Sequence, residues 1–154
     1  MNIRIASEKD IPKLNELLFQ VHKIHADARP DIFITNSKKY NDDELKQLIQ
    51  DYNKTPIFVA EADGVVVGYA FCQVIRESDN SRVQNTLYID DLCVDENLRG
   101  CHVGSDLLNF VVNYAKENNF YNITLNVWAL NEKALKFYEK HGMHIQKYGM
   151  EKIV

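Results

Sequence analysis

A short loop in the second half of the chain has the residue types needed to bind an anion. The segment Arg99-Gly-Cys-His-Val-Gly-Ser105 lies between an expected strand and an expected helix. The start of a helix presents backbone N–H groups without partners and a partial positive charge, so it attracts phosphate groups. Gly100 and Gly104 would let the backbone approach such a group closely, and Arg99 could add a charge-assisted hydrogen bond. A short motif is weak evidence, so the alternative is that this glycine-containing loop only turns the chain and binds nothing.

Other nucleotide-binding and metal-binding patterns are absent from the sequence. Neither G-x-x-x-x-G-K-[ST] nor G-x-G-x-x-G occurs, which disfavours a nucleotide triphosphatase and a dinucleotide oxidoreductase. The cysteines form no C-x-x-C pair and no His/Cys cluster at zinc spacing; they are Cys72, Cys93 and Cys101. We therefore expect no metal site and no disulfide framework, and a reducing, cytoplasmic location.

The size and composition of the chain indicate one soluble domain spanning residues 1–154. Hydrophobic residues make up 45% and charged residues 26%, as in ordinary globular proteins. The net charge is −4, so the basic excess of a nucleic-acid binder is missing. The polar start Met1–Asp10 is unlike a signal peptide, and no apolar run is long enough to span a bilayer. We expect neither nucleic acid nor a membrane as a partner.

The first half of the chain is expected to form one strand and two helices. Residues 2–6 alternate like a short strand. Ser7–Asp10 and Pro12 are typical of a helix start, and apolar residues at helical spacing carry this helix from Ile11 to about His25. Pro30 predicts a loop over His25–Phe33, and Asp42–Tyr52 a second helix.

The second half is expected to be richer in strands. Strands are predicted at Pro56–Glu61 and Val65–Ile75, joined by the turn Ala62-Asp-Gly64, and, after a turn-rich stretch Glu77–Arg82, at about Gln84–Val94. A helix after Gly104, a strand Asn122–Trp128, a helix Asn131–His141 ended by Gly142, and one or two strands in Met143–Ile153 complete the chain. The order β-α-α-β-β-β-α-β-α-β predicts a single mixed domain.

Three segments of this second half resemble the GNAT superfamily of acetyl-CoA-dependent N-acetyltransferases. They are Tyr88–Val94, Arg99–Ser105 and Asn131–Gly142, and residues 1–55 match only in layout. The resemblance implies an α/β (mixed α+β) fold whose mostly antiparallel twisted sheet has about six to seven strands, flanked by about four helices. It also implies acetyl-CoA as acetyl donor, a small-molecule or peptide amine as acceptor, and a possible homodimer.

The same resemblance assigns the acetyl-CoA site to the loop and its neighbours. The amides from Cys101 to Ser105 would hold the pyrophosphate, while Leu92 and Val94 would pair with the pantetheine arm like a strand. The implied cofactor-binding residues are Leu92, Cys93, Val94, Arg99, Gly100, Cys101, His102, Val103, Gly104, Ser105, Asn131 and Phe137. His102 replaces the usual glycine. Three interpretations are open: the loop is slightly strained, His102 contacts a phosphate oxygen, or His102 is an exposed residue without a role in binding.

The reaction implied by the resemblance requires a base, because a protonated amine with a pKa of about 10 has no lone pair for attack. Asp90 or Asp91 could accept the proton, directly or through water. Adjacent residues of a strand point to opposite faces unless a bulge intervenes, so one of the two is expected to face the substrate. The stretch Tyr88-Ile-Asp-Asp91 is similar to Tyr-Leu-Glu-Asp of spermidine/spermine acetyltransferases, which favours Asp90. Alternatively, both are solvated edge carboxylates.

The resemblance also implies an acid and an oxyanion donor. Tyr138 matches the general acid in the pattern Asn-x-x-Ala-x-x-Phe-Tyr-x-x-x-Gly, and the backbone N–H of Leu92 or Val94 would stabilise the oxyanion. Cys93 allows a second route in which a thiolate takes the acetyl group first, but a structural cysteine is the simpler interpretation.

The acceptor amine is expected to lie against the first two helices and the loop between them. Candidate substrate-binding residues are His25, Arg29, Asp31 and Phe33, with His22, Tyr40, Trp128 and Tyr148 as further possibilities. They do not choose among a polyamine, an amino acid, an aminoglycoside and a peptide N-terminus. The alternative function is a catalytically silent module that binds acetyl-CoA; the presence of both an acid and a base candidate argues against it.

Overall fold

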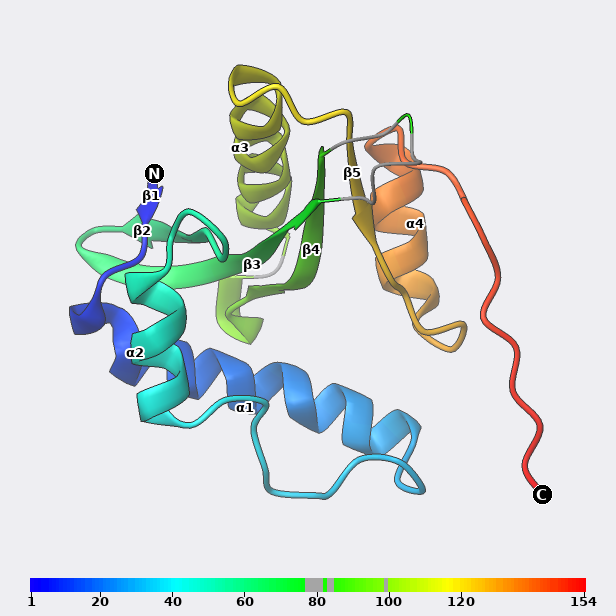
Figure 1. The fold of residues 1–154 in the computed structure, drawn as a ribbon. Coiled ribbons are helices and arrows are strands. Elements are labelled where there is room, and N and C mark those ends of the chain that lie inside the picture. The colour runs from blue at the N-terminus through cyan, green and yellow to red at the C-terminus, as the bar shows by residue number, and fades with distance from the viewer. Residues whose placement is uncertain (77–81, 83–84, 99) are drawn as a thin grey trace.

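The computed structural model of the chain describes residues 1–76, 82, 85–98 and 100–154. Its elements, in chain order, are β1 (Asn2–Ile5), α1 (Ile11–Ala28), α2 (Asp42–Gln50), β2 (Ile57–Ala62), β3 (Val65–Arg76), β4 (Asn85–Val94), α3 (Val103–Glu117), β5 (Asn122–Leu125) and α4 (Glu132–Lys140) (Figure 1). Short 3-10 turns precede α1 and follow β4. The expected cofactor residue Arg99, the expected strand start Gln84 and most of the turn-rich stretch 77–82 lie outside the described residues.

The strands form one sheet in the order β1-β2-β3-β4-β5. Neighbouring strands are antiparallel except for β4 and β5, which are parallel. The mixed α/β architecture with four flanking α-helices is as expected. The described sheet has five strands, and not six to seven, because residues 143–154 form no regular secondary structure.

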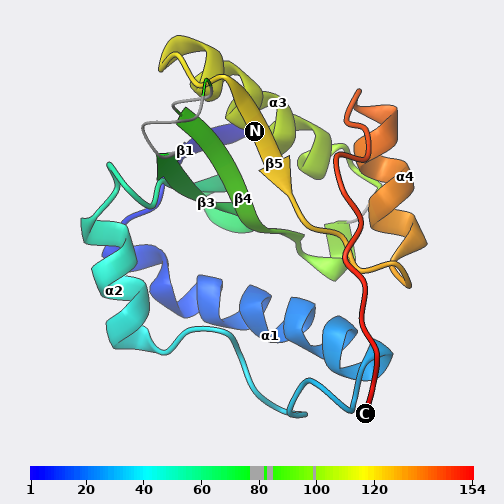
Figure 2. The same cartoon turned by 45° about the vertical axis from the view of Figure 1, so that its right-hand side comes forward.

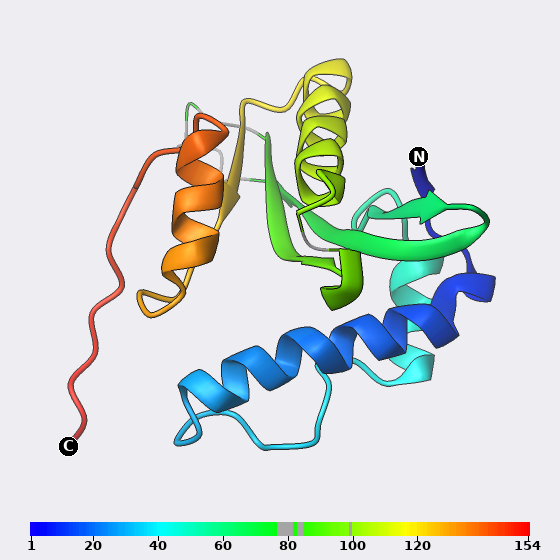
Figure 3. The same ribbon diagram turned by 180° about the vertical axis from the view of Figure 1, so that it is seen from behind.

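Helices cover both faces of the sheet (Figure 3), and buried side chains form one core on each face. On one face, Leu14, Leu17 and Leu18 of α1 and Leu45 of α2 are fully buried against the sheet. On the other face, α3 is packed against the sheet through a set of buried side chains, Val103, Leu107, Leu108, Val111 and Ala115. Both faces of the sheet are therefore covered by the apolar sides of helices.

Local capping explains where the first helices begin. The Asn41 side chain accepts a hydrogen bond from the Glu44 backbone N–H (2.9 Å), and the Glu44 carboxylate accepts one from the Asn41 N–H (2.8 Å). This reciprocal capping box satisfies two amides at the start of α2. Before α1, the Asp10 carboxylate accepts a hydrogen bond from the Ser7 N–H at 2.8 Å, and Pro12 occupies the first turn.

Three expected boundaries were wrong. Helix α1 continues to Ala28, so His25 lies in its last turn and not in a loop; Arg29, which precedes Pro30, leaves the helical region with φ −136°. Strand β5 ends at Leu125 and not at Trp128, because its pairing with β4 stops at Ile89. No strand forms in Met143–Ile153, where the chain runs as an extended arm (Figure 2).

Close packing of α3 on the sheet depends on a glycine in β3. A Cβ atom on Gly68 would lie 2.9 Å from the backbone oxygen of Cys93 and 3.1 Å from Leu107 Cδ1. We predict that Gly68→Ala lowers the free energy of unfolding by about 1–3 kcal/mol, because β4 or α3 must move. Denaturant unfolding measures this loss, with Gly149→Ala, which meets no atom within 4 Å, as the control. Equal stability of the two variants would contradict the predicted overpacking.

Candidate active site

A β-bulge in β4 places both adjacent carboxylates on the same side of the sheet. Phe71 of β3 pairs with Asp91, whereas the next residue, Cys72, pairs with Ile89, so Asp90 is the extra residue. A bulge breaks the alternation of side chains along a strand. Asp90 and Asp91 consequently both interact with residues on the α1–α2 side.

Asp91 lies in a poorly solvated position beside two tyrosines. The Tyr69 hydroxyl donates a hydrogen bond to Asp91 Oδ2 at 2.7 Å, and Tyr69 itself is fully buried. Burial raises the pKa of Asp91 to about 6, although the hydrogen bond from Tyr69 opposes the shift. Burial also raises the pKa of Tyr138, and the charge of Asp91 adds to this effect. Asp91 and Tyr138 are therefore close enough to influence each other electrostatically.

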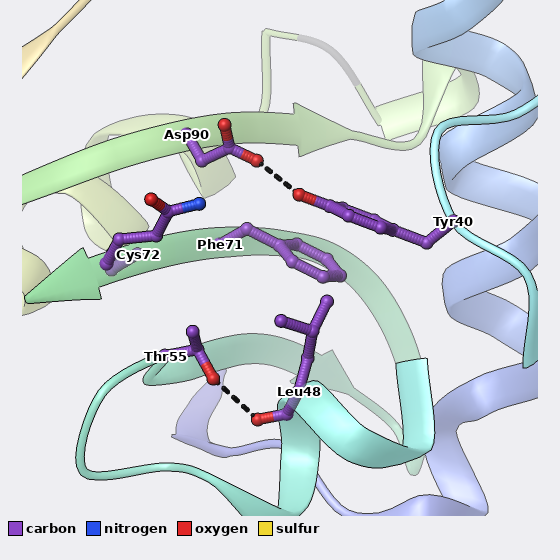
Figure 4. Close-up of a pocket in the computed structure, with 7 residues that line it drawn as sticks. Tyr40, Leu48, Thr55, Phe71, Cys72 and Asp90 are labelled. Atoms are coloured by element: carbon purple, nitrogen blue, oxygen red, sulfur yellow. Dashed lines mark hydrogen bonds between the residues drawn. The ribbon is translucent and has the colours of Figure 1, made fainter. Parts of the chain in front are cut away.

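Asp90 is engaged by the loop between α1 and α2. Its Oδ2 accepts hydrogen bonds from Lys39 Nζ (2.7 Å) and from the Tyr40 hydroxyl (2.8 Å), and the Tyr40 ring is stacked on Phe71 at 5.7 Å (Figure 4). The cavity beside this group has a volume of about 10 Å³. Such a cavity holds one water molecule at most. Asp90 thus links the loop between α1 and α2 to β4 through hydrogen bonds, and the cavity beside it is too small for a substrate.

The sheet opens between β4 and β5 directly next to this bulge. The two strands pair only from Thr86–Asn122 to Ile89–Leu125. Beyond Ile89, no described strand pairs with the β5-facing edge of β4, which continues through Leu92, Cys93 and Val94. Backbone N–H and C=O groups at such an edge can pair with an extended ligand.

The loop after β4 directs unpaired amides toward the same region. Among the described residues, the backbone N–H groups of His102, Val103, Gly104 and Ser105 have no hydrogen-bond acceptor, and the first helical bond is Asp106 N–H to His102 O at 3.0 Å. Gly100 has φ +90°, which favours glycine. His102 has φ +63°, a left-handed conformation that costs a non-glycine residue about 1–2 kcal/mol. Its side chain is exposed and caps nothing.

Helix α4 closes the other side of the opening. Gly104 approaches Phe137 and Val94 closely enough that an added Cβ would lie 3.5 Å from each. The Tyr138 ring is 5.1 Å from the Phe137 ring in an edge-on contact. Asn131 is the N-cap of α4, and its Oδ1 accepts a hydrogen bond from the Ala134 N–H at 3.2 Å. Asn131 therefore has a structural task besides any contact with a ligand.

The expected acceptor residues gather near the end of α1, around an aromatic cluster. Phe33 is stacked on His25 (5.5 Å) and meets Trp128 edge-on (5.7 Å), while the Arg29 guanidinium lies over Trp128 at 5.8 Å. Arg29 also forms ion pairs with Asp31 (2.8 Å) and with Glu151 (2.6 Å) of the extended arm. Burial lowers the pKa of His25, with the charges of His22 and Lys39 as smaller causes.

A pocket of about 90 Å³ adjoins this cluster, and its lining includes residues that sequence reasoning missed. His25, Arg29, Asn131 and Trp128 had been considered, whereas Ile24, Ala28 and Leu130 had not. Glu151 was missed as well, because nothing in the sequence indicates its ion pair with Arg29. Leu130 beside Asn131 is 69% exposed, and exposed large apolar side chains often line binding surfaces, but this exposure is visible only in the structure.

Cys93 lies in the core on the α1 side. It is 5% exposed, and its Sγ is 3.6 Å from the Leu17 carbonyl oxygen. This position agrees with a structural cysteine. In the part of the chain that the structure describes, no group of three or more His, Cys, Asp or Glu side chains is arranged to hold a metal ion, and no helix is both long and apolar enough to cross a membrane.

Comparisons with known proteins agree on one family. The family described as "Acetyltransferase (GNAT) family" matches residues 18–143. N-alpha-acetyltransferase 50 of Danio rerio is 30% identical over 138 residues, which are 89% of this chain and 68% of that protein. An uncharacterised N-acetyltransferase of Methanocaldococcus jannaschii is 27% identical over 91% of this chain and 59% of its own length, so the chain spans less than two thirds of that relative. The crystal structure of a mutant BH1408 protein from Bacillus halodurans superposes with a TM-score of 0.94 at 30% identity, covering 100% of this chain and 99% of that one.

Proposed function

This chain belongs to the GNAT family of acetyltransferases, and from that premise we propose that it transfers the acetyl group of acetyl-CoA to a primary amine. The observation that carries the proposal is the position of the opening between β4 and β5. There a free strand edge, unpaired helix-start amides, the half-buried carboxylate of Asp91 and the half-buried ring of Tyr138 lie close together.

The residues around the opening fit acetyl-CoA. The unpaired amides of His102–Ser105 suit a pyrophosphate, since they offer several donors at the positive end of α3. The free edge of β4 at Leu92 and Val94 suits the amide groups of a pantetheine arm. When bound, acetyl-CoA supplies an activated thioester as the acetyl donor.

We assign the base to Asp91 in preference to Asp90. A general base works best when its pKa is close to the working pH, and that of Asp91 is raised to about 6. Asp90 already accepts hydrogen bonds from Lys39 and Tyr40. Asp91 therefore removes the proton from the acceptor ammonium, directly or through water, while Asp90 holds the α1–α2 loop in place.

Tyr138 is the proposed acid. A tyrosine with its ordinary pKa of about 10 is already protonated at neutral pH, and burial raises the pKa of Tyr138 further, so its hydroxyl has a proton to donate to a leaving thiolate. The acceptor side is formed by His25, Arg29 and Phe33 with Trp128. Asp31 acts indirectly, because it orients Arg29.

The test is release of CoA from acetyl-CoA, followed by chromatography against a panel of amines. The panel contains spermidine, amino acids, aminoglycosides and short peptides with free N-termini. Chromatography separates the CoA thiol from the thiols of the protein's own three cysteines. Amine-dependent release establishes the transferase and its acceptor class. Binding of acetyl-CoA, measured as a rise in the melting temperature, without release for any amine would favour the silent binding module.

We also propose a homodimer formed through the extended arm, residues 143–154. The arm carries exposed apolar side chains, including Tyr148 (80% exposed) and Met150 (92%), and among the described residues the outer edge of β5 has no strand partner. A strand-like apolar segment and an open sheet edge in the same chain can satisfy each other between two copies. Because the sequence has an odd number of cysteines and no C-x-x-C pair, we propose a reducing, cytoplasmic location.

The arm makes the dimer testable. We predict that Tyr148→Asp lowers the mass measured by light scattering from twice the chain mass toward the monomer, because a charge in a paired arm is poorly tolerated. Tyr52→Asp, which changes a 51% exposed tyrosine after α2, is the matched control. A wild-type monomer at all concentrations, or a Tyr148→Asp dimer as tight as the control, would disprove the role of the arm.

A further inference from the structure

One histidine connects the end of α4 to the start of α3. His141 Nδ1 lies 2.7 Å from the Phe137 carbonyl oxygen, and its Nε2 lies 2.9 Å from Ser105 Oγ. The imidazole is also 4.4 Å from the Phe137 ring. His141 is thereby held from both ring nitrogens, and one of its partners is a hydroxyl in the third residue of α3.

The two contacts determine which nitrogen carries the proton. A carbonyl oxygen can only accept, so Nδ1 must be the N–H donor to Phe137. In the neutral imidazole, Nε2 is then an acceptor, and the Ser105 hydroxyl must donate its hydrogen to it. In this state the Ser105 oxygen offers only lone pairs to a ligand at the start of α3.

A bound phosphate group requires the opposite arrangement. The anion has only acceptors, so the Ser105 hydroxyl favours it only by donating to it. Ser105 can do this and keep its contact with His141 only if Nε2 becomes a donor, and both ring nitrogens are donors in the imidazolium alone. Without a proton on His141, lone pairs of Ser105 would face the negative oxygens of the ligand.

We propose that the His141–Ser105 pair couples phosphate binding at the start of α3 to the uptake of one proton by His141. The proton comes from solvent and adds to Nε2, and the Ser105 O–H hydrogen bond turns from His141 to the ligand. His141 is a positioning residue for the Ser105 hydroxyl. The inference rests on the proposed acetyl-CoA site, because it needs the pyrophosphate beside Ser105.

The charged groups nearest to the pair in the sequence make no direct bond to His141. On α4, Glu139 and Lys140 precede His141, and both are exposed; on α3, Asp106 follows Ser105 and is exposed. The exposed histidines His102 and His144 lie before α3 and after α4. Among the described residues, none of these groups forms a hydrogen bond or an ion pair with His141. An imidazole ordinarily changes its charge between pH 5 and 8.

The experiment is calorimetric titration of CoA into the protein in buffers of different ionisation enthalpy, which counts the protons taken up on binding. Ser105→Ala removes the hydroxyl, and His144→Asn is the control for a nearby exposed histidine. We expect the wild type and His144→Asn to take up about one proton more than Ser105→Ala near neutral pH. The Kd of the wild type is expected to weaken roughly five- to tenfold more than that of Ser105→Ala between pH 6 and pH 8. Protons that CoA itself gains or loses on binding are the same for all variants, so they cancel in the comparison.

Nitrogen-15 NMR of the histidines gives a readout without any ligand. We expect neutral His141 in the free protein to carry its proton on Nδ1, and the imidazolium to appear when CoA is added. A proton on Nε2 in the free protein, or equal proton uptake by the wild type and Ser105→Ala, would overturn the coupling. Failure of the wild type to bind CoA would instead refute the proposed site, and the coupling with it.

Discussion

Replacement of Asp91 by asparagine is expected to lower kcat/KM for the acceptor amine by about 10²- to 10⁴-fold. An amide cannot accept the proton that the ammonium must lose, although it keeps the shape of the carboxylate and can still accept the hydrogen bond from Tyr69. The variant is expected to bind acetyl-CoA as the wild type does, because the amides of the α3 loop are unchanged. Steady-state kinetics with the best amine of the panel, together with calorimetric binding of CoA, separates the two effects.

The pH profile of the wild type provides an independent check on Asp91. Its pKa is raised to about 6, so the carboxylate is ionised at pH 7 and becomes protonated as the pH falls through 6. A protonated carboxyl group cannot act as a base, so kcat/KM is expected to fall about tenfold per pH unit below pH 6. This acidic limb is expected to disappear from the residual activity of Asp91→Asn.

A stability measurement tests whether Asp91→Asn loses activity because it misfolds. The pKa of Asp91 is higher in the folded state than in the unfolded state, so the folded state binds the proton of this carboxyl group more tightly. The free energy of unfolding is therefore expected to fall as the pH rises from about 4 to 6 and the carboxyl group becomes charged. Asp91→Asn is therefore expected to be at least as resistant to denaturant as the wild type at pH 7. Asp90→Asn, which loses its ion pair with Lys39, is the matched variant and is expected to retain more activity. A more severe loss in Asp90→Asn than in Asp91→Asn would reverse the assignment of the base.

Tyr138→Phe is expected to lower kcat by about 10²- to 10³-fold with little change in the Kd for CoA. The substitution removes only the hydroxyl that would protonate the leaving thiolate, while the ring keeps its edge-on contact with Phe137. A loss in kcat without a loss in binding marks an interaction made in the transition state. The measurement is a full kinetic series in acetyl-CoA at a saturating amine concentration.

Tyr114→Phe is the matched control for this loss. Tyr114 is a partly buried tyrosine of α3 whose ring packs on Phe58 at 4.9 Å, on the cofactor-side face of the sheet but in its core. Its variant is expected to keep the wild-type kcat. Wild-type turnover by Tyr138→Phe would show that water, and not this tyrosine, protonates the thiolate.

The elements that the sequence predicted well are those with a strong local signal. The hairpin turn at Asp63 and Gly64, the Asn131 cap and the left-handed Gly142 all lie where the residue types indicated. The segment Met143–Ile153 was predicted to form one or two strands, yet a strand exists only where a neighbour pairs with it. Whether a neighbour is present is decided by tertiary structure, which the sequence of the arm does not contain.

The site shows the same division between local and long-range information. The resemblance to the GNAT superfamily assigned Asp90, Asp91 and Tyr138 to one site, and in the structure the charge of Asp91 affects the pKa of Tyr138. The resemblance favoured Asp90, whereas our proposal of Asp91 depends on the hydrogen bonds of Asp90 and the raised pKa of Asp91, which follow from the register of β3 against β4 and from tertiary contacts. The ion pair between Arg29 and Glu151 was also hidden, because its partners are 122 positions apart.

The two cores on opposite faces of the sheet give the molecule a modular construction. The residues proposed to recognise the acceptor lie around α1 and the loop after it, together with Trp128 after β5, whereas the amides proposed to hold the phosphates begin α3 on the other face of the sheet. Free-energy changes at distant sites without shared partners are nearly additive. The acceptor-binding half can therefore diverge toward a new amine by substitutions in α1, α2 and their connecting loop, while the donor-binding half keeps its affinity for the same cosubstrate.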